Sequence, residues 1–234
     1  MAGRQNPTLV PSTLGPLSRG IRLDLSNVSS MDVPLPRYSY ADLQQWEGDT
    51  RWELIDGQPY AMSSPNLIHQ SILGELFVVL KSLFRGGPCR VILSPFDVKF
   101  SEHDVVQPDI LVSCGERLGH AFHQGPPDLV IEILSKSTLR HDRIRKLSLY
   151  ARQGVAEYWL VTQQPLMVEV LQLQQGSYVT RGAYDHTHLL RSPRFPDLAI
   201  DLQELASALP SQPPIEGEVR ESVPPPYSVQ TANS

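Results

Sequence analysis

The spacing of apolar residues changes along the chain, and each stretch of constant spacing predicts one element of secondary structure. The apolar run at residues 129–134 is continuous, which is typical of a strand buried on both faces. Apolar positions at Ile72, Leu76 and Leu83 repeat instead at helical spacing, so they predict a helix with one buried face. The predicted order is a helix that begins at Ser64-Pro65 and ends before Gly86, strands at residues 90–100, 105–112 and 129–134, a helix at residues 139–152, and a strand at residues 157–162.

Two hairpins are predicted beside this core. Asp56-Gly57 lies between strand-like runs at residues 52–55 and 59–62, and glycine accepts the positive φ that a tight turn requires. A second pair of runs, at residues 167–173 and 177–184, predicts another hairpin. We therefore expect an α/β fold with a mixed sheet flanked by helices, an N-terminal β-hairpin and a C-terminal β-hairpin.

Prolines gather at both ends of the chain. Residues 1–36 and 210–234 are rich in proline and hold few apolar residues that could anchor a fold. We expect a flexible N-terminal extension over residues 1–36, one folded domain over residues 37–209, and a disordered Pro-rich tail over residues 210–234. Because no apolar run has the length of a membrane span or the form of a secretory signal, we expect a cytoplasmic protein that does not bind membranes.

The chain is acidic, with a formal net charge of -5 at pH 7. This balance argues against a surface covered with basic residues, so any contact with nucleic acid is expected to be local. Cys89 and Cys114 could pair, but in a chain without a secretion signal we expect both to be free thiols that pack in the interior.

A carboxylate interrupts the apolar run at residues 129–134. Glu132 would be costly to bury there without a partner charge or a metal ion. Asp109 lies in the neighbouring predicted strand, directly after Pro108. Two carboxylates on adjacent strands predict a site for a hard cation.

The predicted helix at residues 139–152 carries a local positive charge. Arg140, Arg143 and Arg145 could lie against the phosphates of a nucleic acid. A solvent-exposed helix face is the alternative explanation for such a cluster. The position of this segment directly after the Glu132 strand favours the functional interpretation.

Several short motifs together resemble a known family. They are Trp52 to Gly57, His69-Gln70, Gln107-Pro108-Asp109, Pro127 to Ser135, Asp142 to Lys146 with Tyr150, Gly154 to Trp159, and Ser192 to Leu198. In this order they resemble the Uma-two type of putative restriction endonuclease, a family of the PD-(D/E)xK nuclease superfamily. The resemblance covers nearly the whole predicted core and leaves out the Pro-rich ends.

The resemblance implies a restriction-endonuclease-like αβββαβ core and a divalent-metal-dependent endonuclease. Asp109, Glu132 and the main-chain carbonyl of Ile133 would hold Mg²⁺ or Mn²⁺, and no small-molecule cofactor is expected. Such an ion can polarise a phosphodiester, so the implied reaction is phosphodiester hydrolysis. DNA is the expected substrate, with RNA left open, and a homodimer would present one site to each strand.

The chain departs from the superfamily at one position. The usual lysine two residues after the second acid is Leu134 here. We expect Lys146 to replace it, because Asp142, Lys146 and Tyr150 lie along one side of the next helix. A surface ion pair between Asp142 and Lys146 is the alternative, and Lys136 is the second candidate for the lysine.

His69 is a fourth candidate catalytic residue, and Glu53 and Tyr150 are candidates for supporting roles. His69 could bind water, metal or phosphate, or it could be a capping or packing residue. Glu53 could support the site from the N-terminal hairpin, or face solvent. Tyr150 is expected to be a packing or supporting residue. An alternative function is also open, namely a catalytically inactive nuclease fold in which Glu132 pairs with Lys146 and the domain binds nucleic acid or a protein partner.

Overall fold

The computed structural model describes residues 35–134 and 141–210, and all of these except Leu35 belong to one compact unit that begins at Pro36. The helices are α1 (Tyr40–Leu43), α2 (Leu67–Leu83), α3 (His141–Gln153) and α4 (Leu202–Ala208). The strands are β1 (Trp52–Ile55), β2 (Gln58–Ala61), β3 (Cys89–Leu93), β4 (Asp97–Lys99), β5 (Val105–Val106), β6 (Ile110–Cys114), β7 (Phe122–Gln124), β8 (Leu129–Leu134), β9 (Glu157–Thr162), β10 (Met167–Gln174), β11 (Ser177–Asp185), β12 (Leu189–Arg191) and β13 (Ala199–Asp201).

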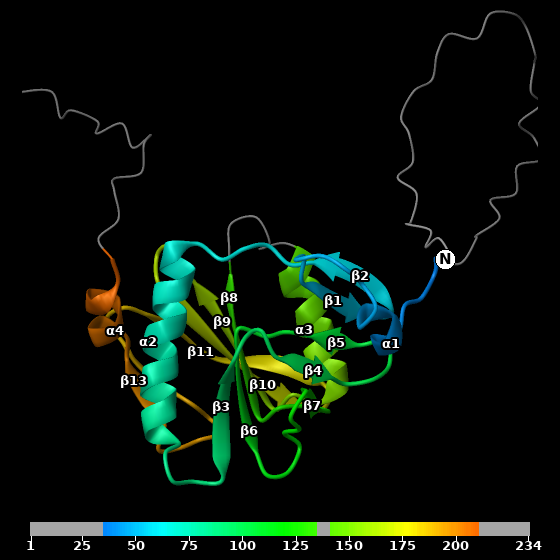
Figure 1. Cartoon of the computed structure of the whole chain (residues 1–234). Helices are drawn as coiled ribbons and strands as arrows, with labels where there is room; N and C mark the ends of the chain where they lie inside the picture. The colour runs from blue at the N-terminus through cyan, green and yellow to red at the C-terminus, as the bar shows by residue number, and fades with distance from the viewer. Residues whose placement is uncertain (1–34, 135–140, 211–234) are drawn as a thin grey trace, which may run out of the picture. The chain divides into compact units, whose positions relative to one another are not determined.

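The described strands form two main sheets and one short strand pair (Figure 1). The six-stranded sheet has the order β11-β10-β9-β8-β6-β3, and only its central pair, β8 and β9, is parallel. The five-stranded sheet has the order β2-β1-β5-β4-β7. Strands β12 and β13 pair with each other. The α/β class and the mixed sheet expected from the sequence are confirmed.

Helices and the smaller sheet cover the two faces of the six-stranded sheet. Helices α2 and α4 pack on one face, where Ile131, Ile133 and Trp159 are buried. Helix α3 and the five-stranded sheet pack on the other face, where Val130 and Leu134 are buried. All six residues of β8 are buried, because successive side chains of this central strand enter opposite cores. The expectation of a strand buried on both faces is therefore confirmed.

Two of the predictions are wrong, because each predicted single strand is two separate strands in the structure. The run at residues 90–100 divides into β3 and β4, and the run at residues 105–112 divides into β5 and β6. In each case the first and second halves belong to different sheets. Pro95 and Pro108 lie at the two breaks, and proline has no N–H group to donate to a sheet. Asp109 consequently precedes β6 instead of lying within a strand.

The start of α2 also differs from the prediction. The helix is capped by Asn66, not by Ser64, because the Asn66 side chain accepts a hydrogen bond of 2.8 Å from the main-chain N–H of His69. Pro65 therefore precedes the cap and is not the first helical residue. The helix then runs to Leu83, near the predicted end.

The expectation of free thiols at Cys89 and Cys114 is wrong, because the two residues form a disulfide. They lie directly opposite each other in the antiparallel β3–β6 ladder. Cross-strand neighbours at such a position have Cβ atoms close enough for a bond. The strand register, which the spacing of the cysteines in the sequence does not reveal, brings them together.

The N-terminal hairpin is fixed to α3 by charged groups. Arg152 near the end of α3 lies 2.7 Å from Asp56 and 3.0 Å from Asp104. Asp56 and Gly57, which form the turn between β1 and β2, have φ values of 54° and 75°, as a tight hairpin turn requires. These contacts hold β1, and the residues that it carries, over the six-stranded sheet.

None of the helices in residues 35–134 and 141–210 is long and apolar enough to cross a membrane.

Candidate active site

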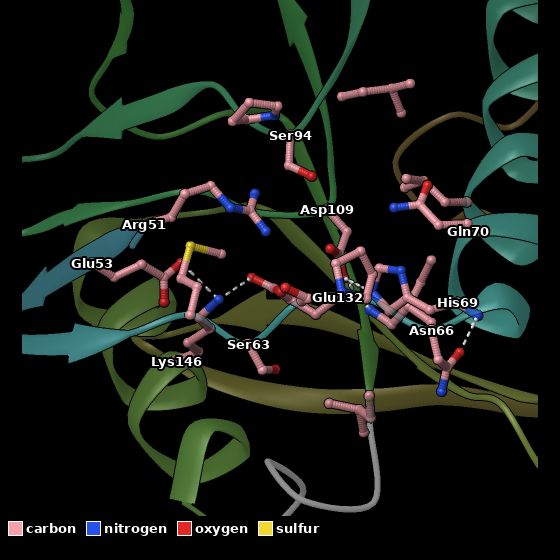
Figure 2. Close-up of a pocket in the computed structure, with 18 of the residues that line it drawn as sticks. Arg51, Glu53, Ser63, Asn66, His69, Gln70, Ser94, Asp109, Glu132 and Lys146 are labelled. Carbon is pink, nitrogen blue, oxygen red and sulfur yellow. Dashed lines mark hydrogen bonds and ion pairs between the residues drawn. The ribbon is translucent and has the colours of Figure 1, made fainter. Parts of the chain in front are cut away.

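A pocket of about 550 Å³ lies where the two sheets meet. Its lining includes Glu53 of β1, Asp109 before β6, Glu132 of β8 and Lys146 of α3. His69, in the first turn of α2, completes the group (Figure 2). Residues that are far apart in the sequence are therefore brought together, including the four predicted catalytic residues Asp109, Glu132, Lys146 and His69.

A buried cluster of charges forms one wall of the pocket. The ammonium of Lys146 lies 2.9 Å from Oε1 of Glu132 and 2.9 Å from Oε1 of Glu53. Tyr150 donates a hydrogen bond of 2.7 Å to the same oxygen of Glu132, and the main-chain N–H of Gln107 donates one of 2.9 Å to Glu53. Glu53 and Tyr150 thus contact the predicted catalytic residues directly, and Glu53 does not face solvent.

Burial sets the proton affinities in this cluster. It raises the pKa of Glu132 to about 8, and the neighbouring Lys146 opposes this rise. Burial alone would lower the pKa of Lys146, but Glu132 and Glu53 outweigh it and hold this pKa above its ordinary value. Lys146 therefore stays charged at neutral pH, and Glu132 binds a proton more readily than an exposed glutamate does.

Asp109 is fixed from two sides. Its Oδ2 accepts a hydrogen bond of 2.7 Å from the main-chain N–H of Ile133, the residue after Glu132. The same oxygen lies 3.2 Å from Nε2 of His69. Among the described residues, the buried Nδ1 of His69 has no hydrogen-bond partner. His69 therefore orients Asp109, which goes beyond the capping or packing role that a lone histidine often has.

The donor set of the pocket fits a hard divalent ion. Oδ1 of Asp109 and Oε2 of Glu132 make no hydrogen bond with any described residue, and Ile133 also lines the pocket. Within the described ranges, no three His, Cys, Asp or Glu side chains are grouped so that they could hold a metal ion by themselves. A site of two carboxylates and a main-chain carbonyl is nevertheless typical of Mg²⁺, which keeps several of its water ligands.

Of the three arginines predicted to contact phosphate, Arg145 is the one whose side chain the structure describes. The Arg145 guanidinium lies 4.3 Å from the centre of the Tyr60 ring, in a cation–π contact. Asp142 and Arg143 lie in α3, but their side chains are outside the described part of the structure. Lys136 and Arg140 also lie outside the described residues. Their predicted roles stay predictions.

Sequence reasoning missed Arg51, whose side chain also points into the pocket (Figure 2). The sequence offered only a weak signal, namely the position of Arg51 directly before β1 and two residues before Glu53, because alternate residues of an extended segment share a face. Other lining residues that the sequence did not single out are Asn66, Ser94 and Gln163.

The fold and the grouped acids define a restriction-endonuclease-like protein of the α/β class. The chain belongs to the Uma2 family, described as "Putative restriction endonuclease", whose model matches residues 40–203. The family resemblance noted in the sequence is therefore confirmed. Membership of this family supports a nuclease function in general terms.

One protein is similar to this chain in sequence, and one is similar in fold. The chain is 31% identical over 137 residues to the uncharacterized protein slr1290 of Synechocystis sp.. This match covers 56% of this chain and 72% of slr1290. The fold is similar to the crystal structure of a "putative nuclease belonging to DUF820" from Anabaena variabilis ATCC 29413, with a TM-score of 0.60 and 24% identity. That similarity covers 71% of this chain and 95% of the Anabaena chain.

Proposed function

We propose that the protein is a divalent-metal-dependent endonuclease that hydrolyses phosphodiester bonds in DNA. The observation that carries this proposal is the hydrogen bond from Ile133 N–H to Asp109, because it fixes the first acid beside the strand that presents Glu132. Both carboxylates line one pocket with Lys146. This arrangement matches the two acids and the basic residue that the family resemblance implies.

Asp109, Glu132 and the Ile133 carbonyl would hold Mg²⁺ or Mn²⁺. A bound ion of this kind supplies Lewis-acid polarisation of the phosphodiester. The protein supplies orientation, because His69 and Ile133 N–H fix Asp109, and because Tyr150 and Lys146 fix Glu132. Lys146 also offsets part of the negative charge that three neighbouring carboxylates place in the pocket.

The test is a nicking assay on supercoiled plasmid with Mg²⁺, with Mn²⁺ and with a chelator. We expect nicking with either ion, no nicking with the chelator, and a loss of at least about 100-fold in Asp109→Asn. Asp197→Asn, which changes an exposed carboxylate away from the pocket, serves as the matched control. Nicking that survives both the chelator and the Asp109 substitution would contradict the proposal.

One observation favours a second function. Lys146 is held between Glu53 and Glu132 and has only 9% of its side chain exposed. This is the pairing expected of an inactive nuclease fold that binds nucleic acid or a protein partner. A correctly folded protein that binds oligonucleotides with every divalent ion tested, but cuts neither DNA nor RNA, would support this alternative.

The choice of substrate and the assembly state belong to the proposal. DNA and RNA substrates of the same sequence should be compared directly, because the pocket residues described here contact phosphate more readily than a particular sugar. We expect a homodimer if the enzyme cuts both strands of a duplex, since a two-fold axis would direct one site at each strand. Light scattering of the full chain measures this state.

A further inference from the structure

The position of Lys146 leaves the pocket short of positive charge. The lysine of a PD-(D/E)xK site is expected to face the phosphate, but the Lys146 ammonium contacts two buried carboxylates at 2.9 Å each. Asp109 adds a third carboxylate to the same pocket. A phosphate that enters would therefore meet a lysine whose charge is already balanced by its neighbours.

Arg51 is a second cation in this pocket. It directly precedes β1, and its carbonyl accepts a hydrogen bond of 2.9 Å from the N–H of Met62, so its backbone is held in line with the hairpin. Arg51 and Glu53 share one face of the strand because side chains alternate along it. Figure 2 shows the guanidinium of Arg51 directed into the pocket, on the same side as Glu53.

No hydrogen bond or ion pair joins the guanidinium of Arg51 to the other pocket residues drawn in Figure 2. Glu53, the nearest acid along the strand, is already engaged by Lys146 and by the main chain of Gln107. Arg51 is also partly exposed, whereas Lys146 is buried. A planar guanidinium that the acids of the pocket do not engage is well suited to bind two oxygens of a phosphate.

We propose that Arg51 binds a phosphate of the nucleic-acid substrate within the pocket, beside Asp109 and Glu132. It thereby supplies the positive charge that Leu134 does not supply at the usual lysine position. Arg51 is then a substrate-binding residue that lies beside the N-terminal hairpin, outside the αβββαβ core. The inference rests on the proposed nuclease function, since it names the group that receives the substrate's phosphate.

The test compares Arg51→Met and Arg51→Lys with Arg191→Met, a matched change of an exposed arginine on β12. Binding of a labelled oligonucleotide is followed by fluorescence anisotropy at several salt concentrations, with Ca²⁺ in place of Mg²⁺. We expect Arg51→Met to weaken binding by roughly 10-fold to 100-fold and to reduce the slope of log affinity against log salt by about 1. Arg51→Lys should lose less affinity, and Arg191→Met should behave like the wild type.

Thermal melting of each variant checks that the fold is intact, and Arg51→Lys, which keeps the charge and most of the volume, serves if Arg51→Met does not fold. An unchanged affinity and an unchanged salt slope in the folded variants would overturn the role of Arg51. So would a wild-type protein that binds no oligonucleotide. The two proposals are separable, because a wild type that binds through Arg51 but never cuts would refute the nuclease function alone.

Discussion

The ammonium of Lys146 lies 2.9 Å from the carboxylate of Glu132, in an ion pair whose side chains are 9% and 10% exposed. A buried pair of this kind contributes little net stability against an apolar pair, but removal of one partner leaves the other charge uncompensated. Here Lys146 also faces Glu53 at the same distance. Lys146 is therefore expected to matter for folding as well as for activity.

Lys146→Met should lower the free energy of unfolding by about 3 to 5 kcal/mol, because two buried carboxylates lose their cation. Urea denaturation followed by circular dichroism measures this change. Lys81→Met, a change of an exposed lysine on α2, is the control and should cost less than about 0.5 kcal/mol. Adding Glu132→Gln to Lys146→Met should recover part of the loss. Equal stabilities of the two lysine variants would show that the pair does not support the fold.

The stability of the metal-free protein should fall as the pH rises from about 5 to about 8. Glu132 has a pKa of about 8 in the folded protein and an ordinary value of 4.5. Between these values the folded state holds more protons than the unfolded state, so rising pH favours unfolding. The contribution of Glu132 is present in full below the lower value and is lost as the pH passes the higher one, with a slope of at most about 1.4 kcal/mol per pH unit.

Urea denaturation at four pH values, with a chelator present, tests this dependence. The curve for Glu132→Gln should be flatter than that of the wild type, because glutamine has no proton to lose. Burial also raises the pKa of Glu157, which would add a slope of the same sign to both proteins. The difference between the two curves therefore isolates Glu132, and parallel curves would contradict the assignment.

Asp109→Asn and Asp109→Ala should both abolish the binding of Mn²⁺ measured by calorimetry, because both lack the carboxylate charge. Their stabilities should differ. Asparagine keeps an acceptor for Ile133 N–H, whereas alanine leaves this group without its partner at a cost of about 1 to 3 kcal/mol. Asp109→Asn also relieves repulsion with Glu132, so its melting temperature should equal or exceed that of the wild type. Retained Mn²⁺ binding in Asp109→Asn would place the metal elsewhere.

Loss of the Cys89–Cys114 disulfide should lower the free energy of unfolding by about 3 kcal/mol, because the bond closes a loop with a sequence separation of 25. The double variant Cys89→Ser/Cys114→Ser, compared with the wild type before and after reduction, measures the effect by urea denaturation. Metal binding should be unchanged, since the Leu93–Ile110 end of the β3–β6 ladder, not the cysteine end, adjoins Asp109. Equal stability of the oxidised wild type and the double variant would contradict this prediction.

The two acids of the site could be predicted from the sequence because each is an unusual residue for the segment in which it lies. Glu132 interrupts a continuous apolar run, and Asp109 follows a proline at the start of such a run. The convergence of Lys146 with them could be proposed from the family resemblance. The site itself stays a proposal, but its predicted members do meet in one pocket.

The missed features depend on which strands pair, and local spacing does not report pairing. The runs at residues 90–100 and 105–112 each look continuous, although each contributes to two sheets. The cysteines bond because the β3–β6 register places them opposite each other. Arg51 was missed because an arginine before a strand is common in sequences. Its place in the pocket becomes visible only when the hairpin is packed against the six-stranded sheet.

The pocket is lined by residues from two different sheets. It is therefore complete only when both sheets have formed and packed together. The six-stranded sheet carries Asp109 and Glu132, but Arg51 and Glu53 arrive with the other sheet. A folding intermediate that had formed only the larger sheet would hold both acids, but it would lack Glu53, the second acid that contacts Lys146, and Arg51. If the protein has the proposed activity, cleavage would begin only after the hairpin has docked on the larger sheet.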